Sequence, residues 1–229
     1  MIYGWITIFL CAGPPLIGAV FFLVYKKGTF RAFFMGAACF FLTQLILRIP
    51  LLNLLSRHND WFALSPYTAP ILYIFLLAFS AGIFEENGRW LFLRYLCRGK
   101  DTWICGIAFG LGHGGIEAIW VLTLSVLPSL FNGTLSLAGP DVILVGTERL
   151  CAISFHIAMS VLVLIGVRKK QYRFCFLAVL IHGLFDLTTA IPNQGIIWAI
   201  LVCAALLSLA FALWTKNQIF IEKKKGEII

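Results

Sequence analysis

Apolar segments long enough to cross a membrane recur along the whole of this 229-residue chain, and they constrain its fold more than any other feature. A bilayer core about 30 Å thick requires roughly 20 predominantly apolar residues in one helix. A helix also satisfies its backbone hydrogen bonds internally, as lipid demands. The sequence therefore predicts an all-α, polytopic membrane helix bundle of about seven transmembrane helices, over residues 4–24, 32–55, 68–93, 103–127, 142–167, 174–190 and 196–214.

Composition agrees with this fold class. The hydrophobic fraction is 61% and the mean hydropathy is +0.94, both above the values of ordinary soluble domains. No low-complexity stretch or linker-like composition divides the sequence. We therefore expect one transmembrane domain over residues 1–229.

The basic residues behind the net charge of +8 are concentrated in alternate loops of the chain. Basic residues follow the first, third, fifth and seventh segments, whereas the loops on the other side carry only Arg57. Positively charged loops are typical of the cytoplasmic face, so the pattern predicts an outside N-terminus and a cytoplasmic C-terminus. Membrane lipid is the expected partner, and nucleic acid is not. The basic residues are Lys26, Lys27, Arg31, Arg94, Arg98, Lys100, Arg168, Lys169, Lys170, Arg173, Lys216 and Lys223 to Lys225.

Two adjacent carboxylates, Glu85 and Glu86, lie within the third apolar segment. A charged side chain at the centre of the bilayer costs about 2.5–3.5 kcal/mol on insertion scales, so such residues usually mark a functional site. Adjacent helical residues point about 100° apart, so the two carboxylates cannot face one atom. Arg89 can pair with one of them and leave the other reactive. The alternative is a purely structural ion pair with Arg89.

Histidines on other segments lie at a similar depth. With about 1.5 Å per residue from the predicted cytoplasmic helix ends, Glu85 and Glu86 lie roughly 12–14 Å deep, and His113, His156 and His182 roughly 12–17 Å deep. Each histidine alone could equally be a hydrogen-bonded core residue. Their common depth predicts one shared site, with access from the cytoplasmic side or laterally between helices.

Two further carboxylates share helix faces with these histidines. Glu117 lies four residues after His113, and Asp186 lies four residues after His182. Carboxylates commonly orient imidazoles, so Asp186 is a candidate site residue. Glu117 is either a supporting site residue or the partner of a histidine.

Other polar and small residues carry weaker expectations. Arg48 is expected near the outer interface, with its side chain snorkelling toward water. Glu148 and Arg149 are expected to pair with other helices. The glycines of segment 103–127 are predicted to let this helix approach the Glu85 helix closely, and a kink beside His113 is plausible.

At these residues the chain resembles the Abi/CAAX-protease clan of intramembrane proteases, and within it the YhfC-type branch of intramembrane metalloproteases. The stretches 112–117 and 148–156 look specific to that branch, and the resemblance spans about half of the chain. The motifs that carry it are Glu85-Glu86-x-x-Arg89, Phe109-x-x-x-His113 and His182-x-x-x-Asp186.

The sequence departs from the clan pattern in two places. Two residues separate the glutamate pair from Arg89, where the common pattern has three. Asp186 stands where the prenyl-protein endopeptidases of the clan carry asparagine, and an ionised carboxylate cannot donate a hydrogen bond to an oxyanion. Asp186 therefore orients His182, holds a proton or helps to ligate a metal.

The resemblance implies an intramembrane endopeptidase of the bacterial plasma membrane that acts on membrane-associated peptides or proteins. Glu85 or Glu86 would act as general base on a water molecule. His113, His156 and His182 would either polarise the scissile carbonyl or bind a divalent ion. Zinc, ligated from among these histidines and Glu85, and a metal-free glutamate mechanism both remain open.

Two functions without catalysis also fit an intramembrane cluster of carboxylates and imidazoles. One is a proton- or ion-coupled transporter, although no inverted repeat is visible between the two halves of the sequence. The other is a non-catalytic membrane scaffold of the same fold.

Overall fold

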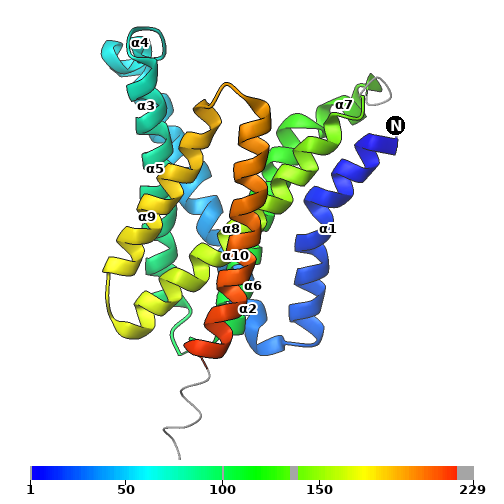
Figure 1. Ribbon diagram of the computed structural model, residues 1–229, viewed down its shortest axis with the longest axis vertical. Helices are drawn as coiled ribbons and strands as arrows, with labels where there is room; N and C mark the ends of the chain where they lie inside the picture. The colour runs from blue at the N-terminus through cyan, green and yellow to red at the C-terminus, as the bar shows by residue number, and fades with distance from the viewer. Residues whose placement is uncertain (1, 100, 135–138, 221–229) are drawn as a thin grey trace, which may run out of the picture.

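The computed structural model describes residues 2–99, 101–134 and 139–220, and every regular element in these ranges is a helix (Figure 1). Seven helices in them are long and apolar enough to cross a membrane, and their ends lie within five residues of the predicted ones. The all-α bundle of seven transmembrane helices is therefore confirmed. The spans are Ile2–Val24, Lys27–His58, Pro70–Leu96, Trp103–Ser125, Val142–Lys169, Arg173–Ala190 and Gln194–Gln218.

Several spans consist of more than one element, and short helices connect others. The elements in chain order are α1 (Ile2–Val24), α2 (Lys27–Phe40), η1 (Phe41–Arg48), α3 (Ile49–His58), α4 (Asp60–Thr68), α5 (Pro70–Leu91), η2 (Phe92–Leu96), α6 (Trp103–Ser125), α7 (Leu127–Phe131), α8 (Val142–Lys169), α9 (Arg173–Asp186), η4 (Leu187–Ala190) and α10 (Gln194–Gln218).

The two ends of the bundle differ in charge. The connections α1–α2, η2–α6 and α8–α9 lie at the lower end in Figure 1, whereas α4, α7 and the α9–α10 connection lie at the upper end. The lower end carries Lys26, Arg98, Lys170 and Lys216, and we call it the basic end. Its placement in the cytoplasm stays a prediction. Other residues of the predicted basic set, Lys100 and Lys223 to Lys225, lie outside the described residues.

Helix α8 runs through the middle of the bundle. Its most apolar stretch is 78% buried, against 50% or less for every other candidate span among the described residues. It packs against α1, α5, α6, α9 and α10. A helix that is apolar on all faces suits a protein interior as well as lipid. The central position of α8 carries His156 into the interior of the bundle.

Glycines allow α6 to lie unusually close to its neighbours. A Cβ atom on Gly112 would overlap the carbonyl oxygen of Phe33 on α2, and one on Gly110 would overlap the Cα atom of Ile157 on α8. The predicted close approach is therefore real, but its partners are α2 and α8 rather than the helix that carries Glu85. Helix α6 is assigned without interruption from Trp103 to Ser125.

The second span changes its helical type at Phe41–Arg48, which is a π-helical segment. Pro50 lies two residues after its end and has no backbone N–H to donate to the preceding turn. Short π-helical segments frequently mark functional sites. Gln44 lies within this segment and is buried, and Arg48 ends it.

Candidate active site

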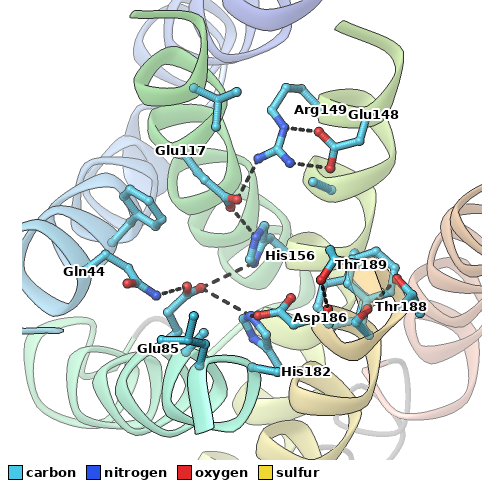
Figure 2. Close-up of a pocket in the computed structure, with 18 of the residues that line it drawn as sticks. Gln44, Glu85, Glu117, Glu148, Arg149, His156, His182, Asp186, Thr188 and Thr189 are labelled. Atoms are coloured by element: carbon cyan, nitrogen blue, oxygen red, sulfur yellow. Dashed lines mark hydrogen bonds and ion pairs between the residues drawn. The ribbon is translucent and has the colours of Figure 1, made fainter. Parts of the chain in front are cut away.

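A cavity of about 700 Å³ lies inside the bundle, within the range typical of ligand pockets (Figure 2). Its walls come from η1, α5, α6, α8, α9 and α10, together with neighbouring turns. Aromatic and aliphatic side chains make up most of the wall. The ionisable residues that line it are Arg48, Glu85, Glu117, Glu148, Arg149, His156, His182 and Asp186.

One oxygen, Oε2 of Glu85, is the point on which the site converges. His113 Nε2 lies 2.9 Å from it, and His156 Nδ1 and His182 Nε2 each lie 3.9 Å from it. Arg89 Nη2 lies 4.0 Å away. The histidines come from α6, α8 and α9 and the glutamate from α5. The structure thus brings together the histidines and the glutamate helix that shared a predicted depth.

The two adjacent glutamates have different surroundings. Glu86 is completely buried and is not part of the cavity wall. Its Oε1 atom lies 3.2 Å from Arg89 Nη1 and 2.7 Å from His182 Nδ1. Arg89 is therefore closer to Glu86 than to Glu85, as expected if it pairs with one carboxylate and leaves the other available. Glu85 is the carboxylate that reaches the cavity.

His182 is held by Glu86 and not by Asp186. Although Asp186 lies one turn along α9, its Oδ2 atom is 3.8 Å from His182 Nε2, beyond hydrogen-bond distance. The other ring nitrogen, Nδ1, turns toward Glu86 on α5. Within the described part of the chain, the Asp186 carboxylate makes no hydrogen bond, and it lines the cavity.

His156 is held from α6 by the carboxylate of Glu117. His156 Nε2 lies 2.5 Å from Glu117 Oε2, and Arg149 Nη1 donates to Glu117 Oε1 at 2.7 Å. Arg149 also donates to both carboxylate oxygens of its neighbour Glu148. Figure 2 shows Glu117 between Arg149 and His156. The expected pairing of Arg149 with another helix is confirmed, whereas Glu148 pairs within its own helix.

Two polar residues of the site were not predicted from the sequence. Gln44 donates a hydrogen bond to Glu85 Oε1, and Arg48 Nη1 donates to Gln44 Oε1 at 3.0 Å. Arg48 Nη2 also donates to the carbonyl oxygen of Leu77 at 2.6 Å. Arg48 therefore turns into the bundle, and the expectation that it snorkels was wrong. The four-residue spacing of Gln44 and Arg48 within an apolar segment was the available signal.

The hydrogen-bond partners assign the proton positions on two imidazoles. A carboxylate only accepts hydrogen bonds, so His156 Nε2 and His182 Nδ1 carry the protons that face Glu117 and Glu86. The other two nitrogens, His156 Nδ1 and His182 Nε2, each lie 3.9 Å from Glu85 Oε2. Arg89 Nη2 lies 3.1 Å from His156 Nδ1 and donates to it, so this lone pair would bind a metal ion only once that hydrogen bond is released.

Part of this cluster fits a divalent metal ion. Ligand atoms of Glu85, His113 and His156 all lie within 4.8 Å of one another, and imidazole with carboxylate is a donor set that suits zinc. The carboxylate of Glu117 on the far side of His156 is the usual device for orienting a ligating histidine. His182 lies outside this three-residue group.

The formal charges around the cavity leave a place for a cation, which a protonated histidine or a divalent metal ion can fill. Five carboxylates and three guanidinium groups lie in or directly behind its wall, so neutral histidines leave two negative charges without a counter-charge. Uncompensated charge is costly in a buried site, and a divalent cation would balance it. The carboxylates are Glu85, Glu86, Glu117, Glu148 and Asp186, and the guanidinium groups are Arg48, Arg89 and Arg149.

Comparison with known proteins identifies the family of the chain. The family model described as YhfC intramembrane metalloprotease matches residues 15–139 and 126–207, which include every site residue named above. The uncharacterized membrane protein YhfC of Bacillus subtilis (strain 168) is 30% identical over 229 residues, covering 86% of this chain and 88% of its own. No solved structure matches. The chain therefore belongs to the YhfC intramembrane metalloprotease family.

Proposed function

We propose that this protein is an intramembrane metallopeptidase that hydrolyses a peptide bond of a membrane-associated polypeptide. The observation that carries the proposal is the position of Glu85, whose carboxylate lies at the cavity wall with three imidazoles around one of its oxygens. A carboxylate beside a cavity can take a proton from water, which is the role of the general base in peptide hydrolysis. The family description supports the same reaction.

In the proposed reaction Glu85 accepts a proton from a water molecule in the cavity. The water oxygen forms a bond to the carbonyl carbon of the substrate, and the bond between that carbon and the amide nitrogen breaks. The proton held by Glu85 passes to the departing nitrogen, so that a carboxylate and an amine are released. The base is then regenerated without any other reactant.

The surrounding residues position the reacting groups. Gln44 fixes the Oε1 atom of Glu85, and Glu86 and Glu117 fix the rings of His182 and His156. These partners direct one nitrogen of each ring toward the reactive carboxylate. Preorganised groups of this kind avoid the cost of reorganisation during the reaction.

The resident ion of the proposal is zinc, which His113 and His156 would hold beside Glu85, with the Glu85 carboxylate kept as the base. When bound, zinc polarises a carbonyl group and activates water as a Lewis acid. His182 remains outside the ligand group, with its Nε2 atom 3.9 Å from Glu85 Oε2.

Peptide hydrolysis can be tested without knowledge of the natural substrate. The purified protein is added to solubilised membrane proteins from its source cells in ¹⁸O-labelled water, and new chain ends are identified by mass spectrometry. We expect new amino termini whose matching new carboxyl termini carry one ¹⁸O atom, because the attacking oxygen comes from water. A mixture without the added protein is the control. The absence of new termini, together with ion flux in vesicles, would support the transporter instead.

The metal content of the purified protein gives a second readout that needs no activity. We expect one zinc ion per chain in the wild type. His113→Ala or His156→Ala should lower the zinc affinity by more than the roughly 10–100-fold that loss of an outer-shell partner costs. The measurement is elemental analysis after dialysis against a zinc buffer. The matched control is His58→Ala, an exposed histidine at the end of α3, which should retain the ion. Zinc retained by both site variants would contradict the ligand assignment.

A further inference from the structure

On every helix that lines the cavity, the lining residues lie between the site and the end of the bundle opposite the basic end. On α5 the lining residue nearest the basic end is Glu85, and the others lie toward the opposite end, from Ile74 to Ala81. On α8 the corresponding limit is His156, and on α9 it is His182. The cavity therefore extends from the reactive carboxylate away from the basic end.

The side of the site that faces the basic end is filled by a packed apolar core. On α6, Ala108 and Phe109 precede His113 and are fully buried. On α8, the stretch from Met159 to Leu164 follows His156 and is buried throughout. Close packing of this kind leaves few voids larger than a water molecule. The other members of this core between the site and the basic end are Trp90, Leu93, Cys97, Cys105, Ala158, Cys175 and Ala178.

A second cavity lies beside the first, and the two share part of their lining. It has a volume of about 470 Å³ and is lined almost entirely by apolar side chains of α8, α9 and α10. Phe155 and Phe185 belong to the walls of both cavities, and their rings stack with centroids 4.3 Å apart. The two stacked rings thus form an aromatic wall on this side of the polar cavity. The polar cavity itself extends from the site toward the end of the bundle opposite the basic end.

We propose that the polypeptide substrate reaches the site from the membrane face opposite the basic end. The basic end is the predicted cytoplasmic end, so the substrates would be polypeptides cleaved in the outer half of the membrane. That the molecule entering the site is a substrate depends on the proposed function. The direction of entry depends only on the shape of the cavity. The depth of the site along its helices favoured cytoplasmic or lateral access. Depth gives only the distance from the site to a helix end, and it does not show whether side chains block the path.

Two positions on α8 allow a matched test of this direction. Ala152 and Ser160 lie four residues before and four residues after His156, so all three share one helix face. Both side chains are buried, but only Ala152 lines the cavity, whereas Ser160 donates to the backbone of His156 within the core. Ala152→Cys and Ser160→Cys are small changes that place a thiol on either side of the site. Both are made with Cys203→Ser, which removes the one exposed cysteine among the described residues.

The two variants are treated with a charged thiol reagent that does not cross membranes. In intact cells Ala152→Cys should react about tenfold faster than Ser160→Cys or the Cys203→Ser background, because thiol reactivity follows exposure. In inside-out vesicles neither should react above the background. Faster labelling of either variant from inside-out vesicles, or no labelling of Ala152→Cys from either side, would overturn the proposed access.

A second probe and an independent readout complete the test. Ala81→Cys, four residues before Glu85 on α5, also lines the cavity and replaces Ala152→Cys if that variant fails to accumulate. Labelling requires no cleavage. If the protein is labelled as expected but releases no ¹⁸O-labelled termini, the access route is supported and the peptidase function is contradicted. A protein that releases ¹⁸O-labelled termini but is not labelled as expected would overturn only the access route.

Discussion

Replacing Glu85 with glutamine should lower the rate of peptide-bond hydrolysis by about 10²–10⁴-fold, the contribution typical of a general base. Glutamine keeps the size of the side chain, but its amide cannot accept a proton from water at neutral pH. The rate is measured as the initial appearance of ¹⁸O-labelled carboxyl termini. Thermal unfolding in detergent should show that the variant remains folded.

The matched control is Glu148→Gln, which makes the same chemical change at another carboxylate of the cavity wall. Both oxygens of Glu148 are bonded to Arg149, and neither faces a histidine. Hydrolysis by this variant should therefore stay close to the wild-type rate. If Glu85→Gln hydrolyses as fast as Glu148→Gln, Glu85 is not the base.

Arg89→Met should lower the free energy of unfolding by about 3–5 kcal/mol, the cost of removing one partner of a buried ion pair. Arg89 is completely buried, 3.2 Å from Glu86 and 3.1 Å from His156 Nδ1. Without the guanidinium group, the Glu86 carboxylate remains buried with an imidazole as its only close partner within the described residues. The measurement is denaturant-induced unfolding in detergent micelles.

Glu86→Gln should restore part of the stability lost in Arg89→Met, because it removes the buried charge that was left without its cation. A double-mutant cycle over these two positions isolates this coupling. Arg94→Met, five residues further along and exposed, should change the free energy of unfolding by about 0.5 kcal/mol or less. Strictly additive effects of Arg89→Met and Glu86→Gln would show that the two residues do not form a coupled pair.

The sequence determined the helical framework well because lipid allows few alternatives. Hydropathy placed all seven spans, and the helix ends in the structure differ from the predicted ones by no more than five residues. Depth along the helices also selected Glu85, His113, His156 and His182, which meet around one oxygen. Rise per residue is a fixed property of a helix, so depth can be read from sequence alone.

The rotation of each helix about its axis, and the hydrogen-bond partner of each polar side chain, could not be predicted from depth along the helix. Gln44 and Arg48 face the cavity from a π-helical segment, and hydropathy does not show which way that segment is turned. His182 has a carboxylate one turn away on its own helix but bonds to Glu86 on another. Both outcomes depend on packing between segments that are distant in sequence.

The assembly of the site from successive helices has a consequence for biogenesis. Glu86 and its partner His182 are separated by 96 residues, and α6 and α8 enter the site between them. A nascent chain therefore holds its glutamate pair in the membrane well before the last histidine has been synthesised. Until α9 has inserted and packed, the reactive carboxylate lacks its full set of imidazoles. If the protein is the proposed peptidase, its order of synthesis would keep it inactive until α9 has inserted.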